Sequence, residues 1–122
     1  MRPILPYLSE IDAPTAAEVV TWPGLTLLEF GTDGCGHCRA AQAAIREWLD
    51  QQPDCAHRKI EDGPGRALGR HFRVKRWPTL ILLRDGHEIA RAERPTQGAD
   101  LLALRSAAQP YHVVDSPQRP MP

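Results

Sequence analysis

The strongest constraint on this chain is a pair of cysteines that stands between an apolar run and an amphipathic run. Residues 25–30 are nearly all apolar, which is typical of a strand covered on both faces, and residues 35–50 carry apolar side chains at helical spacing. Cys35 and Cys38 therefore fall where a strand gives way to a helix. The first N–H groups of a helix lack intrahelical partners and favour an anion, so Cys35 is pushed toward its thiolate form. Cys38 lies one helical turn further on, close enough for the two sulfurs to bond.

Length and composition limit the function classes. With 122 residues, we predict a single domain over residues 1–109 and a mobile tail over residues 110–122, which hold four prolines. The chain has 15 lysines and arginines and 15 aspartates and glutamates. The resulting net charge of zero gives no sign of a surface that binds nucleic acid or a membrane. Three cysteines, no signal-peptide pattern and no apolar run of membrane length lead us to expect a cytoplasmic protein. In that compartment, paired cysteines are more often catalytic or metal-binding than structural.

The remaining pattern predicts a mixed α/β fold. Strand-like and helix-like runs alternate in the first part of the chain, and an Asp-Gly turn then joins two strand-like runs into a hairpin. We expect a central mixed sheet with helices on both faces. The expected strands are 7–11 (a short edge strand), 25–30, 55–60, 79–83 and 87–92, and the expected helices are 15–20, 35–50, 66–72 and 98–108.

From about Leu25 to Leu104, the sequence resembles the thioredoxin family. The resemblance rests on three features in the family's order and spacing: Leu28-Glu29-Phe30 leading into Cys35-Gly36-His37-Cys38, then Trp77-Pro78-Thr79 entering an apolar strand, then the Asp85-Gly86 turn. It implies a thioredoxin-like fold. It also implies a cis peptide bond before Pro78, with the thiolate of Cys35 facing that proline across a substrate groove.

The resemblance and the cysteine chemistry together predict a thiol–disulfide oxidoreductase. Cys35 would attack a protein disulfide, and the more buried Cys38 would resolve the mixed disulfide that forms. The expected partners are disulfide-containing proteins and thioredoxin reductase or another thiol electron donor. We expect a monomer that uses no cofactor and no metal.

Glu29 is the next most informative residue. It interrupts a strand that should be buried on both faces, where an unpaired charge is costly. In thioredoxins, the position six residues before the first cysteine holds an acidic group, so the resemblance implies that Glu29 accepts the proton of Cys38 through a raised pKa. Lys59 resembles the lysine that pairs with this acid. The alternative is a glutamate at a strand edge with its carboxylate in solvent.

Five residues are expected to form the substrate groove: Gly34, Gly36, His37, Trp77 and Pro78. Gly34 stands where most family members have tryptophan, which removes an aromatic wall. A cationic His37 would stabilise the Cys35 thiolate and make the pair more oxidising, unless its side chain is simply solvated. Trp77 could offer backbone groups to an extended substrate and its indole could replace the missing wall, or Trp77-Pro78 could be a purely structural turn.

Two other functions remain open at this level. Cys35, Cys38, Cys55 and His57 could together supply four ligands for zinc, although the sequence lacks a second Cys-x-x-Cys pair. Alternatively, the redox motif could serve one dedicated partner in an interaction module. Otherwise, Cys55 is a bystander within a strand.

Overall fold

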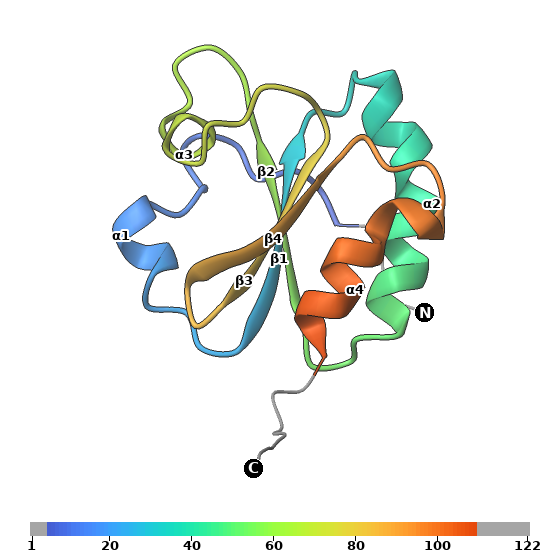
Figure 1. Ribbon diagram of the computed structural model, residues 1–122. Helices are drawn as coiled ribbons and strands as arrows, with labels where there is room; N and C mark the ends of the chain where they lie inside the picture. Colours follow the sequence, from blue (N-terminus) through green and yellow to red (C-terminus); the bar gives the residue numbers. More distant parts are fainter. Residues whose placement is uncertain (1–4, 110–122) are drawn as a thin grey trace.

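The computed structural model describes residues 5–109, which form one four-stranded sheet with helices on both faces (Figure 1). The strand order is β2-β1-β3-β4, with β1 parallel to β2 and antiparallel to β3, and β3 antiparallel to β4. This architecture confirms the predicted mixed α/β class. In chain order, the elements are α1 (Ala16–Val19), β1 (Leu25–Gly31), α2 (Gly36–Asp50), β2 (Ala56–Glu61), α3 (Ala67–His71), β3 (Thr79–Arg84), β4 (His87–Glu93), the 3₁₀ helix η1 (Gly98–Leu101) and α4 (Leu102–Ala108).

Strand β1 lies in the middle of the molecule and is covered on both faces, as its apolar sequence predicts. Successive side chains of a strand point to opposite faces. Leu27 accordingly packs in the cluster under α2 and α4, whereas Leu28 and Phe30 pack in a second cluster under α1 and α3. Glu29 lies two residues after Leu27 and therefore points to the α2 side.

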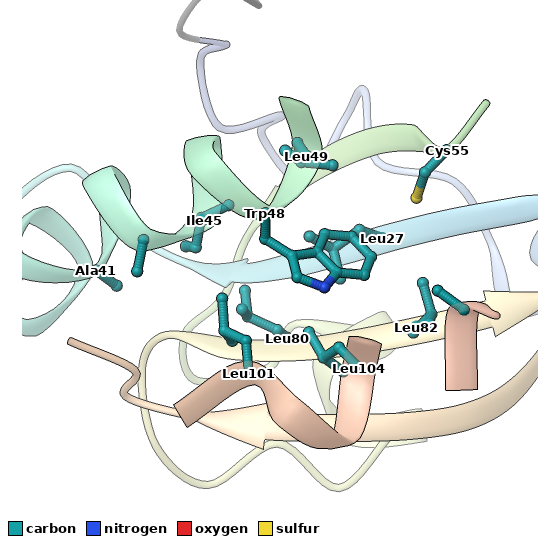
Figure 2. Close-up of a cluster of buried hydrophobic side chains, with 12 residues drawn as sticks. Leu27, Ala41, Ile45, Trp48, Leu49, Cys55, Leu80, Leu82, Leu101 and Leu104 are labelled. Atoms are coloured by element: carbon teal, nitrogen blue, oxygen red, sulfur yellow. The ribbon is translucent and has the colours of Figure 1, made fainter. Parts of the chain in front are cut away.

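The larger cluster anchors the helix that carries the two cysteines. Figure 2 shows Trp48 of α2 between Leu27 of β1 and Leu80 and Leu82 of β3, with Ile45 beside it and with Leu101 and Leu104 closing the cluster from below. Ile45 is fully buried and Trp48 is 3% exposed. Because α2 is packed along this length, its first turn is held at one end of the sheet.

The hairpin between β3 and β4 follows the prediction from its Asp-Gly pair. Asp85 has a φ of 51° and Gly86 a φ of 82°, the left-handed pair that a two-residue hairpin turn requires. A Cβ on Gly86 would lie 2.5 Å from the carbonyl oxygen of Val20, which follows α1 directly. The close contact between this residue and the turn therefore also favours glycine at position 86.

The structure corrects the ends of the predicted elements. The edge strand expected over 7–11 is reduced to one bridge between Leu8 and Ile60, because the backbone N–H groups of Asp12 and Ala13 donate to the carbonyl of Ser9 and turn the chain. The helix expected over 98–108 begins as the 3₁₀ helix η1. Strand β2 begins at Ala56, so the placement of Cys55 within that strand was wrong. The tail predicted over 110–122 lies outside the described residues.

Candidate active site

Cys35 is the N-cap residue of α2. Its backbone is extended, with a φ of −92° and a ψ of 120°, and its Sγ accepts a hydrogen bond from the backbone N–H of Cys38 at 3.2 Å. The Cys35 side chain is half-buried, and Cys38 in the first turn is 2% exposed. The sequence motif therefore gives the predicted arrangement, with one accessible sulfur at the helix start and one buried sulfur a turn further along.

The surroundings of Cys35 favour its thiolate. Partial desolvation opposes ionisation, but hydrogen bonds from the Cys38 side chain and from the backbone N–H groups of Cys38 and His37 outweigh it, aided by the positive charge of Arg94. Together they lower the pKa of Cys35. At neutral pH, Cys35 is therefore more nucleophilic than an ordinary cysteine.

The surroundings of Cys38 have the opposite effect. Burial, the hydrogen bond with Cys35 and the negative charge of Cys35 together raise the pKa of the Cys38 thiol to about 11. Hydrogen bonds with the backbone of Thr32 and the side chain of Tyr7 act in the other direction. Cys38 therefore stays protonated while Cys35 is a thiolate.

Trp77 and Pro78 face Cys35 across the expected groove. The peptide bond between them is cis, as the resemblance implies, and the Sγ of Cys35 lies 3.9 Å from the carbonyl oxygen of Trp77. Arg94 approaches the same carbonyl and donates from Nε at 3.0 Å. The indole N–H of Trp77 donates to Asp62 Oδ2 at 2.9 Å, which fixes the orientation of the ring.

Arg94 is held beside the groove by its own backbone. Its φ of 50° is left-handed, and its N–H donates to the carbonyl of Pro78 at 2.9 Å. The remaining residues expected in the groove, Gly34, Gly36 and His37, are exposed at the start of α2. All five expected groove residues thus lie around the α2 start or the cis peptide bond.

Glu29 is fully buried on the α2 side of the sheet, so the alternative of a solvent-facing carboxylate is wrong. Its Oε2 accepts hydrogen bonds from Tyr7 Oη at 2.9 Å and Gln42 Nε2 at 2.8 Å. Its Oε1 lies 2.9 Å from His57 Nε2. A buried carboxylate with three partners is a satisfied charge, which is the condition under which burial is tolerated.

The expected raised pKa of Glu29 is wrong. Desolvation acts to raise it, but the hydrogen bonds from His57 and Gln42 and the charge of Lys59 outweigh that effect and lower the pKa of Glu29. The carboxylate is therefore ionised at neutral pH. Its ionised form is maintained by partners that the strand sequence alone does not reveal.

Lys59 acts on Glu29 through its charge, whereas its hydrogen bond goes to Gln42. It is the register neighbour of Glu29 in β2 and is 5% exposed, but its Nζ lies 3.4 Å from Gln42 Oε1 and 4.3 Å from the centre of the Tyr7 ring. His57 precedes it by two residues on the same face of β2 and makes the direct contact with the carboxylate.

Four residues at this site were not predicted to act in disulfide exchange: Tyr7, Gln42, His57 and Arg94. Gln42 lies four residues after Cys38 on α2 and donates from Nε2 to the carbonyl of Cys38 at 2.8 Å. Helical spacing from Cys38 and strand alternation from Lys59 could have marked Gln42 and His57. Tyr7 comes from a segment outside the matched motifs, and no local signal identifies it.

The four ligands of the zinc alternative do not come together. Cys55 packs in the apolar cluster with Leu27 and Trp48, and His57 is engaged with Glu29. Between residues 5 and 109, no three histidine, cysteine, aspartate or glutamate side chains are grouped so that they could hold a metal ion. In the same range, no helix has the length and apolar character needed to cross a membrane.

Comparisons with known proteins agree with this geometry. The structure of thioredoxin 2 from Pseudomonas aeruginosa PAO1 in its reduced form is 48% identical, with a TM-score of 0.75, and the match covers 85% of this chain and 95% of that one. Thioredoxin-2 of Pyricularia oryzae is 32% identical over 87 residues, covering 69% of this chain and 48% of that protein. Thioredoxin H2-1 of Oryza sativa is 28% identical, and the match covers 69% of this chain and 63% of that protein.

The chain thus spans between about half and two thirds of the length of these two curated relatives. The sequence model of the Thioredoxin family matches residues 12–106, which include both cysteines, the cis peptide bond and the hairpin. This chain belongs to the thioredoxin family.

Proposed function

We propose that this chain is a thiol–disulfide oxidoreductase that acts on protein disulfides by dithiol–disulfide exchange. One observation carries the proposal: two sulfurs lie one helical turn apart, with the pKa of the accessible Cys35 lowered and the pKa of the buried Cys38 raised. Exchange needs an exposed thiolate to attack and a second thiol held in reserve within reach.

The reaction proceeds through a mixed disulfide. The Cys35 thiolate attacks one sulfur of the substrate disulfide, an S–S bond forms, and the other substrate sulfur leaves as a thiolate. Cys38 then loses its proton and attacks the Sγ of Cys35, and the second substrate sulfur leaves. The substrate gains two electrons, and Cys35 and Cys38 end as a disulfide.

The groove of Gly34, Gly36, His37, Trp77 and Pro78 receives the substrate in this proposal. An extended substrate segment can lie along exposed backbone near the cis peptide bond, as strands do when they add to a sheet edge. The small side chains at the start of α2 leave access to Cys35. All of these groups belong to one chain, so a monomer suffices for the reaction.

Substitution of each cysteine tests the proposal. With insulin as substrate and dithiothreitol as reductant, Cys35→Ser should reduce turnover to the rate without protein. After dithiothreitol is removed, Cys38→Ser should still attack insulin but remain joined to it as a mixed disulfide that mass spectrometry detects. Trapping by the Cys35 variant in place of the Cys38 variant would reverse the roles, and insulin reduction by both variants would reject the proposal.

The choice of electron donor separates a general enzyme from one that serves a dedicated partner. One observation favours a dedicated partner. Arg94 already donates to the Trp77 carbonyl beside Cys35, so the backbone of a substrate must compete with Arg94 for this acceptor. Turnover with thioredoxin reductase would favour a general cytoplasmic reductant. Turnover with dithiothreitol alone would favour a dedicated donor and partner.

A further inference from the structure

The hydroxyl of Tyr7 lies between the resolving cysteine and the buried carboxylate. We propose that Tyr7 relays the proton of Cys38 to Glu29 when Cys38 attacks the mixed disulfide. This inference rests on the proposed function and names the route by which its second step loses a proton. Tyr7 is then a catalytic residue, because its hydroxyl touches a reacting sulfur.

The Cys38 thiol, the Tyr7 hydroxyl and the Glu29 carboxylate lie in sequence. Tyr7 Oη donates to Glu29 Oε2 at 2.9 Å, and Tyr7 Oη and Cys38 Sγ both approach the same point beside Gly31, where each shifts the pKa of the other. In the mixed disulfide, Cys35 no longer accepts the Cys38 proton, and because the single hydroxyl proton of Tyr7 is donated to the carboxylate, the Tyr7 oxygen can then accept from the thiol. Once Cys38 is ionised, the Tyr7 hydroxyl donates to its sulfur, which is the interaction that lowers the pKa of Cys38. The three groups are therefore ordered as donor, relay and acceptor.

The fold keeps Tyr7 in this position from three sides. The next residue, Leu8, donates its N–H to the Lys59 carbonyl at 2.7 Å, which fixes the segment against β2. The ammonium of Lys59 lies over the Tyr7 ring at 4.3 Å. On the third side, a Cβ on Gly31 would lie 2.5 Å from Cys38 Sγ and 2.9 Å from Tyr7 Oη, so only glycine lets both atoms approach the same point.

The protonation states suit a relay. Tyr7, His57 and Lys59 face Glu29, and Tyr7 and Cys35 face Cys38. Burial and the Glu29 carboxylate raise the pKa of Tyr7 well above its usual range, so the hydroxyl keeps its proton at rest. Glu29 is ionised and can accept a proton on Oε2, while His57 holds Oε1 in place as a positioning residue.

The step balances as two proton transfers and one displacement. The Cys38 proton passes to Tyr7 Oη as the Tyr7 hydroxyl proton passes to Glu29 Oε2. The electron pair of Cys38 forms the bond to Cys35 Sγ, and the bond from that sulfur to the substrate breaks, leaving its electron pair on the substrate thiolate. Because the mixed disulfide has already removed the negative charge of Cys35, two of the effects that raise the pKa of Cys38 are absent at this point.

The variant Tyr7→Phe tests the relay, since it keeps the ring and removes only the hydroxyl. Ellman's reagent separates the two steps, because attack by Cys35 releases one coloured thiolate and resolution by Cys38 releases a second. In stopped-flow measurements, we expect an unchanged first phase and a second phase slower by about 10²-fold or more, the usual contribution of a positioned acid or base. Cys38→Ser is the control: it should lack the second phase, which identifies that phase as resolution by Cys38.

The pH profile distinguishes a relay from a structural contact. In Tyr7→Phe, the second phase should rise about tenfold per pH unit, because hydroxide must then ionise Cys38, whereas the unsubstituted protein should show a flat profile above the range of Glu29. Glu29→Gln should slow the second phase as much as Tyr7→Phe does, and the double variant should lose no more. Equal second phases in Tyr7→Phe and the unsubstituted protein would overturn the relay.

A measurement on the unsubstituted protein keeps the inference testable if a variant does not fold. In mixtures of H₂O and D₂O, two protons moving together give a curved dependence of the second-phase rate on the deuterium fraction. A linear dependence would overturn the relay while leaving the proposed function intact. If Cys35→Ser still showed the first phase at full rate, the proposed function itself would fail, independently of Tyr7.

Discussion

The two sulfurs of this site are three residues apart, yet their surroundings differ in almost every respect. Cys35 is half-buried at the end of a helix, receives N–H groups from the first turn and faces the charge of Arg94. Cys38 is buried beside Tyr7, whose hydroxyl donates to the carboxylate of Glu29. One helical turn thus separates a site that stabilises a thiolate from a site that stabilises a thiol.

The contrast shows which parts of the fold decide the chemistry. The environment of Cys35 comes mostly from local structure, namely the helix start and its N–H groups. The environment of Cys38 is assembled from distant segments, because Tyr7, Glu29 and His57 come from the N-terminal segment, β1 and β2. Changes to one environment should therefore leave the other largely intact.

The largest effect should come from removing the carboxylate at the centre of the Cys38 environment. Glu29→Ala leaves His57, Gln42 and Tyr7 without their shared acceptor, and loss of one member of a buried charged network costs about 3–5 kcal/mol of the free energy of unfolding. Urea unfolding followed by circular dichroism measures this. Glu47→Ala, at an exposed position of α2, is the control and should change stability by less than about 0.5 kcal/mol.

The stabilities of the unsubstituted protein and of Glu29→Ala should also depend differently on pH in acid. The pKa of Glu29 is lowered in the folded state, so its contribution to stability is complete above the ordinary value of 4.5 and is lost as the pH falls through the folded-state pKa. The stability difference between the unsubstituted protein and Glu29→Ala should shrink below pH 4.5. A difference that grows in acid would contradict the lowered pKa.

A moderate effect is expected from filling the space that Cys38 and Tyr7 share. Gly31→Ala places a methyl group 2.5 Å from Cys38 Sγ, and such overpacking typically costs about 1–3 kcal/mol. Gly34→Ala is the matched control, because a Cβ there meets no atom within 4 Å. Thermal unfolding of the two variants should show a lower midpoint for Gly31→Ala alone, and equal midpoints would mean that the sulfur and hydroxyl are not packed as described.

The smallest effect should come from the exposed charge near Cys35. Arg94→Ala should raise the pKa of Cys35 and slow its attack on Ellman's reagent at neutral pH by less than about fivefold, as expected for an exposed charge pair worth up to about 1 kcal/mol. Arg76→Ala, which removes a surface partner of Glu93, is the control and should leave the first phase unchanged. A first phase that is faster in Arg94→Ala would contradict the electrostatic role.

Much of this fold could be predicted from the sequence, because its signals are local. The apolar run of β1, the helical spacing after Cys38 and the Asp85-Gly86 turn each predict the element that the structure contains. The edge strand over 7–11 was wrong because alternation over a few residues does not reveal the turn that Ser9 begins. The start of η1 differs from the predicted α-helix because apolar spacing does not distinguish the two kinds of helix.

The sequence predicted those parts of the site in which the type of a residue and its spacing along the chain determine the chemistry. Cys35, Cys38 and the burial of Glu29 follow from the motif and from a charge within an apolar strand. The pKa direction of Glu29 did not follow, because it depends on His57 and Gln42, which approach only in the folded chain. Lys59 was placed correctly on β2, but its direct hydrogen bond goes to Gln42.

The most direct test of the central claim is the ionisation of each sulfur in the same protein. Alkylation by iodoacetamide can be followed for Cys35 and Cys38 separately by peptide mass spectrometry as the pH is raised. We predict a midpoint for Cys35 below the ordinary cysteine value of 9.0 and a midpoint for Cys38 of about 11. A midpoint for Cys35 at or above 9.0, or ionisation of Cys38 before Cys35, would contradict the account.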